Sequence, residues 1–101
     1  MAMPAPKKEY SQNVKNLLNN LRNHLNNWKN KQNNITDVEM ENMKQTMNEL
    51  NTNCKHMGGN LNKTWNNLHK NINSRLSKKT MEKKDFQNFN NMIQQMLKEL
   101  K

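Results

Sequence analysis

The sequence is short of the residues that make a large hydrophobic core. Only 32% of its 101 residues are apolar and five are aromatic, whereas an ordinary soluble domain is roughly 45–50% apolar. Nine methionines supply much of the remaining bulk, and methionine adapts its shape so readily that it specifies one packing poorly. The length therefore suits one domain with a thin core, and a homodimer would bury more surface.

Cysteine, proline and long hydrophobic runs are also scarce. The lone cysteine, Cys54, excludes a disulfide within the chain and fits a reducing compartment. The N-terminal part lacks the apolar segment of a signal peptide, and no run approaches the roughly 18 apolar residues of a transmembrane helix. We therefore expect an intracellular, cytoplasmic protein. Both prolines fall in residues 1–8, where we expect a disordered tail before a single helical bundle domain at 9–101.

Acidic residues are few. Eight Asp and Glu stand against 17 Lys and Arg, which gives a net charge of +9. This excess favours an anionic partner, either nucleic acid or an acidic protein surface. The most suggestive feature is a basic cluster that could neutralise several phosphates in a salt-sensitive way; its members are Arg75, Lys78, Lys79, Lys83 and Lys84. The alternative interpretation of this cluster is a solvated connector between helices.

Residues 35–57 carry the clearest helix signal in the chain. Thr36 and Glu39 have the spacing of a capping box, in which each side chain bonds to the other residue's backbone N–H. The glycine pair Gly58-Gly59 then marks the end of the helix. Between these signals the apolar residues recur at steps of four and three, as on one face of a helix; they are Met43, Met47, Leu50, Cys54 and Met57.

Three further apolar stripes have helical spacing and predict three more helices. The stripe residues are Val14, Leu17, Leu18, Leu21, Leu25 and Trp28 in the first helix (about 9–29), Leu61, Trp65, Leu68, Ile72 and Leu76 in the third, and Phe86, Phe89, Ile93, Met96, Leu97 and Leu100 in the fourth. Ser11, Asn60 and Thr80 are the candidate N-caps. A short polar loop at 30–34 makes the first two helices antiparallel neighbours. The expected fold class is all-α, an up-down four-helix bundle.

The region 60–101 leaves a second arrangement open. Its apolar residues keep a seven-residue spacing, and no Gly or Pro interrupts it. A single helix of about 40 residues, roughly 60 Å long, would then pair with a second copy to form an intertwined dimer of long helical hairpins. The bundle is preferred because the charged residues near the middle of this region would interrupt an apolar seam.

Three residues are candidate ligands for a haem or metal cofactor. His24 and His69 border the apolar faces of their helices, and Cys54 lies within a stripe. Facing helices are where bundles hold cofactors, but ordinary boundary histidines and a buried thiol explain the same pattern. We expect no dedicated metal site and no catalytic residue, because neither a carboxylate pair nor an activated nucleophile is visible.

The segments VKNLLNNLRNHL (14–25) and DFQNFNNMIQQML (85–97) alternate polar pairs with apolar singles and doubles. This resembles binary-patterned de novo four-helix-bundle proteins, although the chain lacks their glycine turns between helices one and two and between three and four. The resemblance implies an idealised bundle, sometimes domain-swapped, with at most incidental cofactor binding. An orphan gene product would have similar properties.

These observations favour a non-enzymatic helical scaffold or interaction protein whose basic surface binds an anionic partner. The alternative is a cofactor-binding (haem or metal) or weakly catalytic helical bundle that uses His24, His69 and Cys54.

Overall fold

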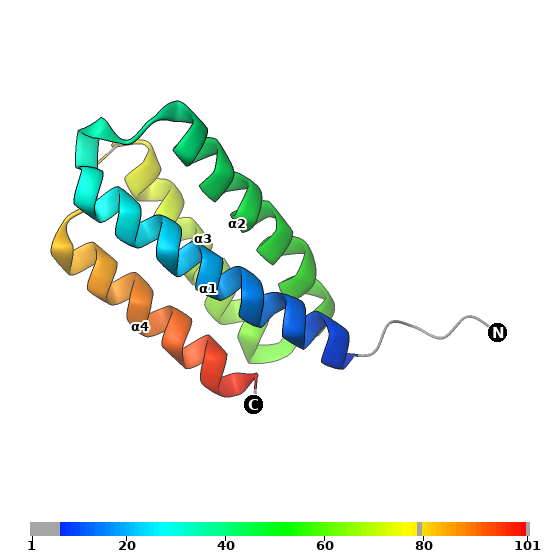
Figure 1. The fold of residues 1–101 in the computed structure, drawn as a ribbon. Coiled ribbons are helices and arrows are strands. Elements are labelled where there is room, and N and C mark those ends of the chain that lie inside the picture. The colour runs from blue at the N-terminus through cyan, green and yellow to red at the C-terminus, as the bar shows by residue number, and fades with distance from the viewer. Residues whose placement is uncertain (1–6, 79, 101) are drawn as a thin grey trace.

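The computed structural model describes residues 7–78 and 80–100, which are helical apart from short connections. The four α-helices are α1 (Lys7–Lys31), α2 (Asp37–Met57), α3 (Gly59–Leu76) and α4 (Lys83–Glu99), and a 3-10 helix, η1 (Gln32–Asn34), joins α1 to α2. Successive helices run in opposite directions, so α1 begins and α4 ends at the end of the bundle that holds the α2–α3 turn (Figure 1).

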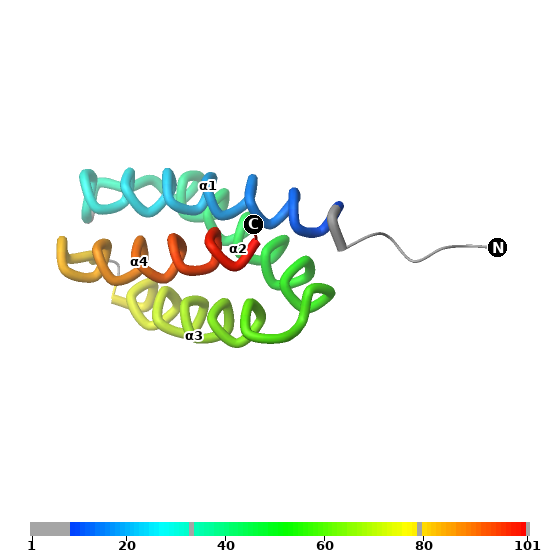
Figure 2. Tube along the Cα trace, turned by 90° about the horizontal axis from the view of Figure 1, so that it is seen from below, coloured from blue at the N-terminus to red at the C-terminus, as the bar shows by residue number. Residues whose placement is uncertain are grey.

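The helices pack in ring order. α1 contacts α2 and α4, and α3 contacts the same two helices; Figure 2 shows α4 lying alongside both α1 and α3. The predicted up-down four-helix bundle is therefore confirmed. The four apolar stripes form its core, and every predicted stripe residue is either buried or packed against the buried cluster.

The two tryptophans are the largest fully buried side chains. The indole N–H of Trp65 on α3 donates to Asn51 Oδ1 on α2 at 3.4 Å, whereas Trp28 Nε1 is buried without a partner in the described part of the chain. Because the chain has few apolar residues, these two indole rings and the methionines on α2 supply much of the core volume.

The predicted limits of α2 are confirmed. The backbone N–H of Glu39 donates to Thr36 Oγ1 at 3.2 Å, and the backbone N–H of Thr36 donates to Glu39 Oε1 at 3.2 Å. At the other end the Gly58 N–H donates to the Cys54 carbonyl at 2.9 Å. Gly58 has φ 66° and ψ −166°, a combination that is essentially restricted to glycine.

The three other predicted caps were wrong. Ser11 lies inside α1, which begins at Lys7, and its hydroxyl donates to the Leu100 carbonyl at 3.5 Å. Gly58, rather than Asn60, precedes the first residue of α3. Glu82, rather than Thr80, caps α4, with its N–H donating to Asp85 Oδ2 at 3.1 Å. Of the tail predicted at 1–8, residues 1–6 lie outside the described residues and residues 7–8 are helical.

The single long helix over 60–101 was also wrong, because the chain reverses between Leu76 and Lys83. Met81 in this connection is 1% exposed and belongs to the core. Its backbone is held by Gln32 of η1, whose Oε1 accepts from the Met81 N–H at 3.2 Å and whose Nε2 donates to the Met81 carbonyl. A contact between residues 49 positions apart thus stabilises the reversal.

Candidate functional site

The predicted basic cluster is divided by the fold. Arg75 Nε lies 3.0 Å from Asp85 Oδ2, so this cation is neutralised and ties α3 to α4. Lys78, Lys83 and Lys84 are exposed around the α3–α4 connection. Lys79 lies outside the described residues. The cluster therefore provides three described exposed lysines rather than five cations.

A row of cations on α1, which the sequence analysis missed, extends this basic surface. Lys15, Arg22 and Lys29 are seven residues apart, so they share one side of the helix at intervals of about 10.5 Å. That side faces α4, because Lys29 Nζ lies 4.5 Å from the centroid of the Phe86 ring. All three are partly buried, which indicates that their aliphatic stems pack along the seam between α1 and α4.

These residues, with the exposed lysines of α4, define the α1–α4 basic face: Lys15, Arg22, Lys29, Lys83, Lys84 and Lys98. None of the six forms an ion pair within the described part of the chain, where the pairs are Lys31–Glu39 and Arg75–Asp85. Glu82 and Glu99 are exposed at the ends of α4, but residues 10–34 contain no acidic residue. The cations along α1 therefore have no acidic neighbour on their own helix.

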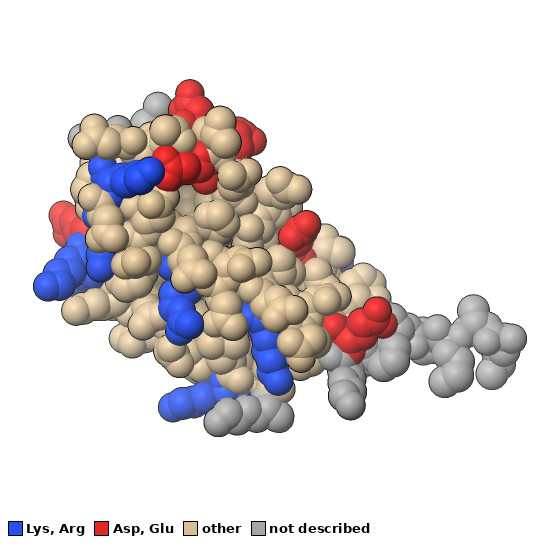
Figure 3. Space-filling model, viewed as in Figure 1, with Lys and Arg blue, Asp and Glu red and all other residues tan. Residues whose placement is uncertain are grey.

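Half of the eight acidic residues lie on α2: Asp37, Glu39, Glu41 and Glu49. In Figure 3, Lys and Arg follow α1 and α4, whereas most Asp and Glu lie over α2. Glu39 is the most strongly held of these acids: it accepts from Lys31 Nζ at 2.9 and 3.0 Å, from Asn27 Nδ2 and from Thr36. The bonds from Lys31, Asn27 and Thr36 lower the pKa of Glu39 to about 2. Among the described helices, α2 is therefore the one whose acidic residues outnumber its basic residues.

The three candidate cofactor ligands lie in different surroundings. His24 lines an open groove of about 400 Å³ between α1 and α2, and His69 lines one of about 260 Å³ between α2 and α3. Burial lowers the pKa of both imidazoles, and His69 also stacks on Trp65 with ring centroids 5.1 Å apart. Cys54 is buried in the core, where desolvation raises the pKa of its thiol to about 12.

Among the described residues, no group of three or more His, Cys, Asp or Glu side chains is placed to hold a metal ion. The structure therefore does not bring His24, His69 and Cys54 into one cluster of that kind. Each histidine instead has asparagines as neighbours in its own groove.

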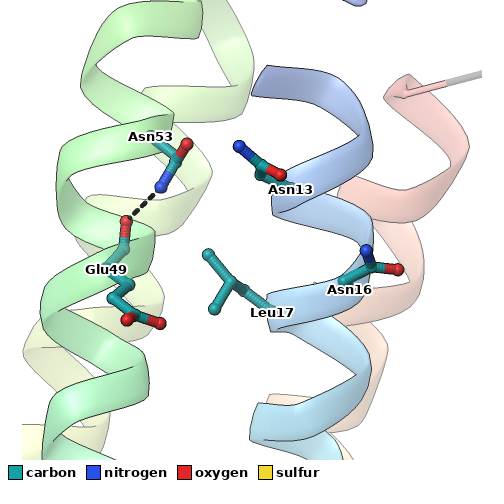
Figure 4. A pocket seen from close by; sticks show the side chains of 5 residues that line it. All are labelled: Asn13, Asn16, Leu17, Glu49 and Asn53. Carbon is teal, nitrogen blue, oxygen red and sulfur yellow. Dashed lines mark hydrogen bonds between the residues drawn. The ribbon is translucent and has the colours of Figure 1, made fainter. Parts of the chain in front are cut away.

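A further groove of about 340 Å³ lies between the first half of α1 and the second half of α2. Asn13, Asn16 and Leu17 line it from α1, and Glu49 and Asn53 line it from α2 (Figure 4). Leu17 fills the space between the helices, and Asn53 Nδ2 donates to the backbone carbonyl of Glu49 at 2.8 Å. The groove offers amides and one carboxylate, which can form hydrogen bonds but include no activated nucleophile.

The seven-residue spacing of Lys15, Arg22 and Lys29 could have been read directly from the sequence. It was missed because these cations are dispersed along the chain and become a row only on a helix. None of the described helices is long and apolar enough to cross a membrane. The chain matches no family model, and comparison with curated proteins and with solved structures found no match either.

Proposed function

We propose that this protein is a non-enzymatic helical interaction protein that binds nucleic acid through the α1–α4 basic face. One observation carries the proposal: six cations lie on two adjacent helices without an intramolecular ion pair among the described residues, while half of the eight acidic residues lie on α2. Unpaired cations grouped in this way produce a local positive field, which attracts and orients a polyanion.

The arrangement suits a phosphate backbone. The α1 row extends over about 21 Å from Lys15 to Lys29, and α4 presents further lysines beside it. Cations that displace counterions from phosphates give an affinity that falls steeply with salt. Because the face is formed by two packed helices, the backbone positions of its cations are fixed before binding, which reduces the entropy that ordering would cost.

Charge reversal at two positions tests the proposal. Lys83→Glu with Lys84→Glu places two acids in the first turn of α4, where the helix dipole favours them, so the variant is expected to fold. The matched control is Lys63→Glu with Lys70→Glu on exposed positions of α3. Both variants change the net charge equally, so only the location of the change differs.

The measurement is fluorescence anisotropy of labelled DNA over a range of salt concentrations. Each lost phosphate contact reduces the slope of log affinity against log salt by about 1. We expect the Lys83/Lys84 variant to lose affinity and to reduce this slope, whereas the α3 control retains most of both. Equal losses in the two variants would show that only the total charge matters and would contradict a defined face.

Binding of haem or metal is the second candidate, and it is supported by the two partly buried histidines that line polar grooves. Spectral titration of the wild type and of the His24→Ala and His69→Ala variants tests it. Loss of a saturable spectral change in either variant would support cofactor binding at that histidine, and unchanged titrations would make both histidines bystanders.

A further inference from the structure

The outward side of α1 carries an unbroken row of amide side chains. The residues recur at steps of four and three, and each is exposed: Gln12, Asn16, Asn19, Asn23, Asn26 and Asn30. This spacing keeps them on one side of the helix over about 27 Å. The row lies beside the cations Lys15, Arg22 and Lys29, so amides and cations form two parallel lines on one helix.

Helix stability does not explain this choice of residues. Asparagine is a weaker helix former than lysine, glutamate or glutamine, because its short amide competes for backbone hydrogen bonds. Three members are engaged locally: Gln12 donates to Asn16 at 3.4 Å, and Asn19 accepts from Arg22 at 3.1 Å. The exposed sides of α2 and α3 instead mix charges with amides, as with Glu41 and Lys44 or Lys63 and Lys70.

Amide side chains have a specific use against DNA. Asn and Gln can form two hydrogen bonds with the N6 and N7 atoms of adenine, and the major groove of B-DNA is wide enough to admit an α-helix. Cations beside such a helix would contact the phosphates at the groove edge and fix its position. The acids Glu49 and Glu39 of α2 share grooves with Asn16 and Asn23 on the side of α1 away from α4. Their charge favours an approach with the α4 side of α1 nearest the backbone.

We propose that α1 lies in the major groove of duplex DNA, where its amide row contacts adenine edges and gives a preference for A·T-rich sequences. This inference rests on the proposed function, because the α1–α4 basic face supplies the phosphate contacts. Duplex RNA is a poor alternative, since its major groove is too deep and narrow for side chains to read. Single strands are a poor alternative as well, because they are bound by stacking on exposed aromatic rings. Among the described residues the exposed large hydrophobic side chain is Val38, which is not aromatic.

The experiment compares the full-length wild type with two double variants. Asn23→Ala with Asn26→Ala removes two amides from the centre of the row. Asn67→Ala with Asn71→Ala makes the same change at exposed positions of α3. Alanine is the best helix former, so both variants are expected to fold, which circular dichroism checks.

Each protein is titrated with A·T-rich and G·C-rich duplexes of equal length and with an RNA duplex. A well-placed amide–adenine pair favours the correct base by roughly 5- to 150-fold. We expect the wild type and the α3 control to bind the A·T-rich DNA at least about 5-fold more tightly than the G·C-rich DNA. The Asn23/Asn26 variant should lose most of this preference and keep the salt slope, because its phosphate contacts are unchanged.

Three results would overturn the inference: equal affinity of the wild type for both DNA duplexes, an A·T preference that the Asn23/Asn26 variant retains, or equally tight binding of RNA. Salt-sensitive binding without a base preference would overturn this inference alone. An absence of binding to every duplex would overturn the proposed function as well.

Discussion

Replacement of Gln32 tests how η1 is held to the connection between α3 and α4. Gln32 has φ 50°, and its carboxamide bonds to the backbone N–H and carbonyl of Met81 and donates to the Lys29 carbonyl at 2.8 Å. In the Gln32→Ala variant the Met81 groups lose their partner, and leaving a buried polar group unpaired costs about 1–3 kcal/mol. Because the Met81 backbone is close to the core, we expect a loss of stability in that range.

Gln32→Gly separates the side-chain contribution from the backbone contribution. A residue with a side chain pays about 1–2 kcal/mol for the left-handed conformation, and glycine does not. The Gly variant is therefore expected to be more stable than the Ala variant, although both lack the same hydrogen bonds. Urea unfolding followed by circular dichroism measures both. An Ala variant as stable as the wild type would refute the contact between η1 and the α3–α4 connection as a source of stability.

Three further predictions concern α2 and its ends. The bonds from Lys31, Asn27 and Thr36 lower the pKa of Glu39 from 4.5 to about 2. The stability that this carboxylate contributes is therefore complete above pH 4.5 and is lost as the pH falls towards 2. In urea unfolding, the free energy of unfolding of Glu39→Gln should therefore depend less on pH over that range than that of the wild type. Cys54→Ser would bury a hydroxyl in place of the thiol and should cost about 1–3 kcal/mol, while a thiol reagent should modify wild-type Cys54 only as fast as the bundle opens, which absorbance measures. Gly58→Ala should cost about 1–3 kcal/mol in thermal unfolding through backbone conformation alone, since an added Cβ would have no atom within 4 Å; Asn60→Ala, its control, should cost nothing.

The limits of α2 and the four apolar stripes could be predicted because they depend on residues close together in the chain, although the other three predicted N-caps were wrong. The capping box of Thr36 and Glu39, the stop at Gly58 and the apolar stripes all follow from spacing within a few turns. The reversal after α3 was predicted as the preferred of two arrangements, but the contacts that hold it were not predicted. These contacts are the burial of Met81 and its bonds to Gln32, and residues 49 positions apart leave no periodic signal.

The same distinction between local sequence and tertiary contacts applies to the candidate site. Exposure of Lys83 and Lys84 followed from the predicted basic cluster, but the pairing of Arg75 with Asp85 did not, because it requires the turn between α3 and α4. The neighbourhoods of His24 and His69 also depend on which helices adjoin. Both border the apolar face as expected, yet α2 places them in different grooves.

The most direct test of the account is a nitrogen–proton NMR titration of the labelled full-length protein with an A·T-rich DNA duplex. We predict that the largest chemical-shift changes fall on the backbone and side-chain amides of α1, with a second set on α4 near Lys84 and Lys98. Changes confined to α2 and α3, or a spectrum that does not respond to DNA at low salt, would contradict the claim that the α1–α4 face is the binding surface.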